Sequence, residues 1–145
     1  MANPIRADAS SAVRVLLVED HDILRQALSL AFEPLADIDL VAEAKLGGEG
    51  VAAARQHQPD VVLLDRRLPD GDAIDVIGQF HQASPDSRVL VMTGYSNDLI
   101  VARAIEAGAA GLALKEVKVD GLVSTIRRVA AGERVFPSNR AQGAR

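Results

Sequence analysis

Five short apolar runs recur along the chain, and more polar stretches separate them. The first, third and fourth runs, residues 13–18, 60–64 and 88–92, are apolar almost throughout. Runs of this length and composition are typical of strands that are buried on both faces of a parallel sheet. Residues 38–44 alternate more between apolar and polar positions, and residues 110–114 form the last run. The pattern therefore predicts five strands, with the second at an edge of the sheet.

Amphipathic segments follow each of these runs. Apolar residues recur at helical spacing between Ile23 and Phe32 and again between Val119 and Ala130. Asn97, with Asp98 beside it, is a suitable N-cap for another helix, and Gly108 can end that helix. The predicted helices cover residues 23–32, 51–57, 74–81, 98–106 and 119–130.

Strands that alternate with helices indicate an α/β fold. Right-handed crossovers then place helices on both faces of a parallel, doubly wound sheet, which makes a three-layer sandwich. The 145 residues suffice for one domain, which we expect at residues 13–132. Residues 1–12 are interpreted as a disordered N-terminal tail, and residues 133–145, which lose the periodicity, as a C-terminal tail or linker.

Composition excludes several classes of protein. The chain has no cysteine, so disulfides, thiolate metal sites and a cysteine nucleophile are absent. A net charge of −4 argues against general nucleic-acid binding. Residues 1–11 have no apolar stretch that would make a signal peptide, and the apolar runs are too short to span a membrane. We therefore expect a cytoplasmic protein that has no membrane partner.

Polar side chains follow four of the predicted strands. Glu19 and Asp20 come after the first strand, Asp65 after the third, Thr93 at the end of the fourth and Lys115 after the fifth. The carboxyl ends of parallel strands meet at one edge of a sheet, where such folds bind ligands. Crowded carboxylates repel one another and need a cation. Oxygen ligands favour Mg²⁺, so the sequence predicts a magnesium site.

These residue types match the needs of phosphoryl transfer, which requires a positioned nucleophile and neutralised oxygens. Asp65 can act as the nucleophile and form an acyl phosphate. Lys115 can neutralise one phosphoryl oxygen, and the Thr93 hydroxyl can donate to another.

Each residue also has a simpler interpretation when it is taken alone. Asp20 could cap the following helix, Thr93 could belong to a simple turn, and Lys115 could be a surface lysine. Residues 69–71, Pro-Asp-Gly, are ordinary turn residues. The three histidines, His21 among them, lie on different elements and are interpreted as structural or surface residues.

Four segments in order resemble the signature segments of bacterial response-regulator receiver domains, which are CheY-like. They are VRVLLVEDH, VVLLDRRLPDGDAIDVI, VLVMTGY and AAGLALKE. The resemblance covers residues 13–132 and implies a flavodoxin-like strand order, 2-1-3-4-5. It also implies a phosphoprotein of a two-component signal transduction system that is phosphorylated by a histidine kinase or phosphotransfer protein and is not an enzyme, although it can catalyse its own dephosphorylation.

The family also implies a different role for each residue at the metal. Asp20 would bind Mg²⁺ directly, and Glu19 would act through water. Asp65 would be both phosphoacceptor and ligand, and the main-chain oxygen of Arg67 would be the third protein ligand.

The segments VEDHDILRQAL and IRRVAAGERVFPS are similar to the NarL/FixJ subfamily, whose regulators carry a LuxR-type helix-turn-helix. This similarity implies a role in transcriptional control, with the DNA-binding domain following in the parent protein and no direct DNA binding by these residues. Phosphorylation would switch partner or homodimer contacts. Leu112 stands where many receivers have an aromatic switch residue, so an aromatic switch is not expected.

Three other functions compete with this interpretation. A stand-alone receiver would act by protein–protein interaction alone. A haloacid-dehalogenase-like phosphatase would need a second acid two residues after Asp65, where Arg67 stands. A flavodoxin-like nucleotide binder would need a phosphate-binding loop after the first strand, but the acidic residues 19–22 would repel phosphate.

Overall fold

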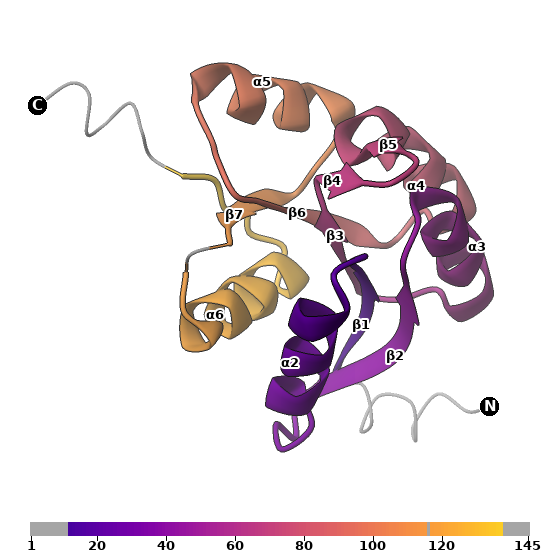
Figure 1. Cartoon of the computed structure of the whole chain (residues 1–145), viewed down its shortest axis with the longest axis vertical. Helices are drawn as coiled ribbons and strands as arrows, with labels where there is room; N and C mark the ends of the chain where they lie inside the picture. The colour runs from indigo at the N-terminus through magenta and orange to yellow at the C-terminus, as the bar shows by residue number, and fades with distance from the viewer. Residues whose placement is uncertain (1–11, 116, 138–145) are drawn as a thin grey trace, which may run out of the picture.

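The central sheet has five parallel strands in the order β2-β1-β3-β6-β7 (Figure 1). The computed structural model describes residues 12–115 and 117–137. The strands are β1 (Val13–Val18), β2 (Ile38–Ala44), β3 (Val61–Asp65), β6 (Arg88–Thr93) and β7 (Gly111–Leu114). The predicted fold is confirmed, including the edge position of residues 38–44.

Helices cover both faces of this sheet (Figure 1). One core cluster joins Leu16 and Val18 of β1 to Phe80 on the face that carries three helices. The other joins Leu17 to Ile126 on the opposite face, because successive strand residues point to opposite sides. The first face is covered by α3 (Gly47–His57), α4 (Ile77–Ala83) and α5 (Asp98–Ala107), and the second by α2 (Asp22–Phe32) and α6 (Val119–Ala130).

The ends of α5 follow the predicted chemistry. The Asn97 side chain accepts a hydrogen bond from the Ile100 N–H at 2.8 Å, which caps the first turn. Gly108 ends the helix with a φ of 101°, a left-handed conformation that glycine adopts at little cost. Leu112 is buried against the same side of the sheet as α5, so it packs as a core residue.

The loop after β3 is more structured than the sequence indicated. Its predicted turn lies inside a short antiparallel hairpin formed by β4 (Arg67–Leu68) and β5 (Gly71–Asp72). A 3₁₀ turn, η1 (Ala73–Val76), then leads into α4, and the Asp72 side chain caps it by accepting from the Ile74 N–H at 3.0 Å. The predicted helix at residues 74–81 therefore begins as a 3₁₀ turn.

The chain continues to contact the sheet after α6. Val135 pairs in parallel with Gly111, donates to the Ala110 carbonyl at 3.1 Å and accepts from the Leu112 N–H at 2.9 Å. These bonds satisfy main-chain groups at the β7 edge, so residue 135, beyond the boundary predicted at residue 132, contacts the sheet. The rest of the two predicted tails, residues 1–11 and 138–145, lies outside the described residues. No helix within the described part of the chain is long and apolar enough to cross a membrane.

Candidate functional site

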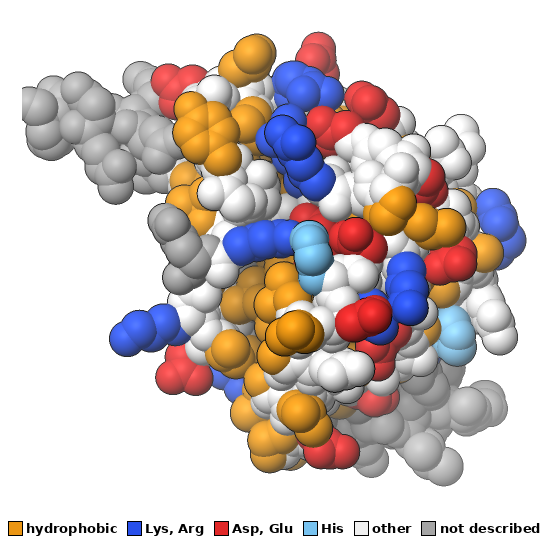
Figure 2. All heavy atoms as spheres, viewed as in Figure 1, with side chains coloured by type: hydrophobic (Ala, Val, Ile, Leu, Met, Phe, Trp, Pro, Cys, Tyr) orange, Lys and Arg blue, Asp and Glu red, His pale blue; other side chains and the backbone are white. Residues whose placement is uncertain are grey.

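The carboxyl ends of four strands bring the predicted site residues to one edge of the sheet. Asp65 is the last residue of β3, and Thr93 is the last residue of β6. Both line a cavity of about 350 Å³ together with Lys115. Acidic, basic and histidine side chains gather at the centre of the face shown in Figure 2, over these strand ends. The parallel order of the strands therefore produces the convergence that the sequence predicted.

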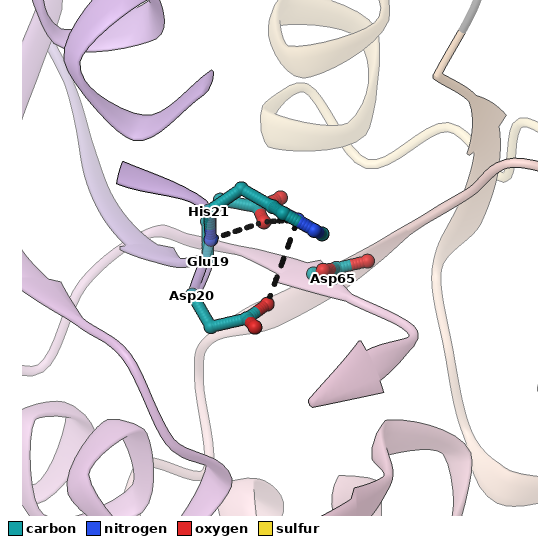
Figure 3. A group of neighbouring side chains, drawn as sticks. All are labelled: Glu19, Asp20, His21 and Asp65. Carbon is teal, nitrogen blue, oxygen red and sulfur yellow. Dashed lines mark hydrogen bonds and ion pairs between the residues drawn. The ribbon is translucent and has the colours of Figure 1, made fainter. Parts of the chain in front are cut away.

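An acidic cluster forms one side of this site. Glu19, Asp20, His21 and Asp65 each offer one ligand atom, and these four atoms lie within 4.8 Å of one another (Figure 3). Glu19 and Asp65 are buried, with 0% and 1% of their surface exposed. Within the described residues, three carboxylate oxygens are buried without a hydrogen-bond donor: Glu19 Oε1, Asp20 Oδ1 and Asp65 Oδ2. Buried anionic oxygens that lack a hydrogen-bond donor fit a hard cation such as Mg²⁺.

Lys115 supplies a positive charge beside the buried carboxylates. Its Nζ atom lies 2.9 Å from Asp65 Oδ1 and 3.5 Å from Glu19 Oε1. Burial raises the pKa of Asp65 to about 6; the Lys115 hydrogen bond opposes this rise, and the Glu19 charge adds to it. Burial by itself would lower the pKa of Lys115, but the two carboxylates raise that pKa above its ordinary value.

His21 is a site residue that the sequence analysis missed. Its main-chain N–H and its Nδ1 atom each lie 3.0 Å from Glu19 Oε2, so residue 21 holds the Glu19 carboxylate (Figure 3). The ring is 68% exposed, as expected for a surface residue, but it also lines the cavity. The only signal in the sequence was its position directly after the acidic pair.

Asp20 does not cap the helix that follows it. His21 occupies the N-cap position of α2, and no side-chain hydrogen bond caps the helix there. Asp20 Oδ1 is instead buried within the acidic cluster, 3.7 Å from His21 Nδ1. The capping explanation for Asp20 is therefore wrong.

The Thr93 hydroxyl points into the loop that follows β6. It donates to the Tyr95 carbonyl at 2.8 Å, and the Tyr95 N–H approaches it at 3.3 Å. Tyr95 itself is 64% exposed. Thr93 must therefore exchange its bond to Tyr95 in order to donate to a group bound at Asp65.

Two arginines follow Asp65 directly. The Arg67 N–H lies 3.4 Å from Asp65 Oδ1, which places its main chain beside the carboxylate, whereas its side chain is exposed. The role of the Arg67 main-chain oxygen as a metal ligand stays a prediction. Arg66, which the sequence analysis did not single out, lines the cavity and pairs with Asp72 at 3.3 Å.

Comparison with known proteins identifies relatives over most of the chain. Residues 15–127 match the family described as the response regulator receiver domain. The chain is 36% identical over 132 residues to the DNA-binding transcriptional activator DevR/DosR of Mycobacterium tuberculosis. This alignment covers 91% of this chain and 60% of that protein. It is 32% identical over 124 residues to the response regulator protein VraR of Staphylococcus aureus. This alignment covers 86% of this chain and 59% of that protein.

A solved structure shows the same likeness in three dimensions. The crystal structure of a two-component response regulator of the LuxR family from Aurantimonas sp. SI85-9A1 superposes with a TM-score of 0.83 at 31% identity. The match covers 90% of this chain and 94% of that one. By contrast, the chain spans only about 60% of the length of the curated relatives named above.

Proposed function

The chain belongs to the response regulator receiver family, and we propose that Asp65 is the aspartate on which it is phosphorylated. One observation carries this assignment. Asp65 is buried at the end of β3, with Oδ1 paired to Lys115 at 2.9 Å and Oδ2 without a donor among the described residues. A histidine kinase or a phosphotransfer protein would be the donor.

The transfer needs no acid or base beyond the residues at this edge. A carboxylate oxygen of Asp65 forms a bond to phosphorus while the bond from phosphorus to the donor histidine nitrogen breaks, and the electron pair stays on that nitrogen. Lys115 neutralises one phosphoryl oxygen and Thr93 donates to another. Hydrolysis of the acyl phosphate at the same site would return the protein to its resting state.

The acidic cluster would hold Mg²⁺ during this reaction. Asp20 and Asp65 would bind it directly, and Glu19, whose Oε2 already accepts from His21, would act through water. The main-chain oxygen of Arg67 would complete the protein ligands. Bound Mg²⁺ would neutralise charge on the acidic cluster and on a phosphoryl oxygen.

The signal would leave through the face formed by α5, β7 and α6. Thr93 exchanges its bond to Tyr95 for one to the phosphoryl group, which moves the loop that feeds α5. Apolar side chains are already exposed around this face: Tyr95, Leu99, Val117 and Val119. An effector or a second copy of the chain could select the altered surface, since a partner shifts a population by its differential affinity.

The relatives indicate the use of this switch. One is a DNA-binding transcriptional activator, and this chain spans about 60% of it. The proposal therefore includes transcriptional control through a part of the parent protein beyond these residues. A stand-alone receiver that acts by protein contacts is the second candidate, because the exposed apolar residues near α5 fit that use equally well.

Intact mass spectrometry tests the assignment. With Mg²⁺ and acetyl phosphate, the wild-type protein should gain one phosphoryl group, and Asp65→Asn should gain none. Asp75→Asn is the matched control. It removes an exposed carboxylate of η1, and this carboxylate pairs with Arg103 rather than with a residue of the site. An equal mass gain in wild type and Asp65→Asn would overturn the assignment.

A further inference from the structure

The loop that follows Asp65 needs an anchor. Its hairpin has two residues in each strand, with Arg67 opposite Asp72 and Leu68 opposite Gly71. A two-stranded hairpin of this size is at best marginally stable by itself. The Arg67 N–H is also 3.4 Å from the Asp65 carboxylate, so movement of the hairpin would move groups at the site.

Asp70, in the turn of the hairpin, provides such an anchor. Its Oδ1 accepts from the Gly47 N–H at 2.9 Å, and its Oδ2 accepts from the Gly48 N–H at 3.1 Å. These are the first two residues of α3, whose N-cap residue Leu46 makes no side-chain cap. Asp70 thus caps a helix that lies more than twenty residues earlier in the chain. The two N–H bonds hold the pKa of its carboxyl below the ordinary value.

Helix α3 is a firm support because it packs tightly against β1. A Cβ atom at Gly50 would lie 2.8 Å from the Val18 side chain and 3.0 Å from that of Phe80, so the helix approaches as closely as glycine allows. Val18 is the last residue of β1 and directly precedes Glu19. Asp70 therefore ties the hairpin after Asp65 to the helix that packs on β1, the strand that directly precedes the acidic pair.

From this arrangement we infer that Asp70 is a positioning residue of the metal site. Among the described residues it makes no hydrogen bond or ion pair with Asp65, Glu19 or Asp20, and it acts by holding the hairpin at a set distance from β1. The Arg67 main chain is then kept beside Asp65 before a metal binds. This inference rests on the proposed function, because it concerns Mg²⁺ at the same site.

Titration with Mg²⁺ alone, followed by amide chemical shifts, tests the inference on the full chain. Asp70→Ala should weaken Mg²⁺ binding about tenfold, a typical effect of losing a residue that orients metal ligands. Asp70→Asn keeps one acceptor for Gly47 and should fall between Asp70→Ala and wild type. In wild type, the Gly47 and Gly48 amide signals should move as Mg²⁺ binds, and in Asp70→Ala they should not respond.

Controls separate positioning from stability alone. Asp75→Ala removes an exposed carboxylate that pairs with Arg103 and should leave Mg²⁺ affinity unchanged. Thermal unfolding without Mg²⁺ reports the loss of the cap by itself. If Asp70→Ala or Asp70→Asn unfolds at a lower temperature but binds Mg²⁺ as wild type does, Asp70 is only a helix cap and the inference is overturned.

Failure of the proposed function would look different. If Asp20→Asn and Asp65→Asn also bind Mg²⁺ as tightly as wild type, the acidic cluster is not the metal site, and the assignment of the site is wrong. If these two variants lose binding while both Asp70 variants keep it, only the positioning role fails.

Discussion

Lys115 Nζ lies 2.9 Å from Asp65 Oδ1 in the cavity at the strand ends. The same ammonium group is 3.5 Å from Glu19 Oε1, so one cation faces two buried carboxylates. The charge of the metal-free cluster is therefore not balanced by Lys115 alone. Burial of Asp65 is the main reason that its pKa is raised to about 6 although Lys115 is bonded to it, and the nearby charge of Glu19 adds to the rise.

The first prediction concerns the stability of the metal-free protein. The pKa of Asp65 is higher in the folded chain, about 6, than its ordinary value of 3.8, so the folded state binds more protons between these values. Stability from this group is therefore lost as pH rises from about 4 to about 6 and stays low above that. Asp65→Asn should unfold several degrees higher than wild type at pH 7.5, with the difference shrinking toward pH 4.

Thermal unfolding monitored by circular dichroism in EDTA measures this difference. Added Mg²⁺ should stabilise wild type and leave Asp65→Asn unchanged, because a ligand stabilises only the state that binds it. A difference between the two proteins that is equal at pH 4 and pH 7.5 would contradict the role given to ionised Asp65.

The second prediction ranks the acidic pair. Asp20 Oδ1 has no hydrogen-bond donor in the described part of the chain, whereas Glu19 Oε2 accepts twice from His21. Asp20→Asn should therefore weaken Mg²⁺ binding by about tenfold or more relative to wild type. The effect of Glu19→Gln should be smaller. Amide chemical shifts during an Mg²⁺ titration give both affinities, and equal or reversed effects would exclude Asp20 as the direct ligand.

The third prediction concerns the relay from the site. Beryllofluoride, whose fluorines stand in for phosphoryl oxygens, should shift the amide signals of residues 93–98 and of residues around Lys115. In Thr93→Ala the changes near Asp65 should persist, and those on the α5 and α6 face should shrink, because the hydroxyl that bonds to Tyr95 is missing. Undiminished changes on that face would show that Thr93 is not the relay.

The fourth prediction concerns DNA. With a net charge of −4, these 145 residues should show no sequence-specific binding to DNA at physiological salt. Fluorescence anisotropy with several duplexes measures this directly. A clear preference for one sequence would mean that the receiver residues themselves contact DNA.

The sequence alone was sufficient to predict the fold and most of the residues that meet at the candidate site. The apolar runs predicted all five strands of the sheet, and the apolar stripes at helical spacing predicted helices between them. The alternation of residues 38–44 predicted the edge strand. The meeting of Asp65, Thr93 and Lys115 could be predicted because parallel strands place their carboxyl ends together. These features depend on local periodicity and on chain topology, both of which can be seen in a sequence.

Contacts between distant segments were decided only by the tertiary structure. A proline-aspartate-glycine turn predicts a reversal of the chain, but nothing in it predicts that Asp70 caps Gly47. Val135 was assigned to a tail, yet it pairs at the β7 edge, because a sheet edge accepts any segment that can reach it. Each contact depends on the final distance between segments that lie far apart in the chain, which folding sets and local pattern does not record.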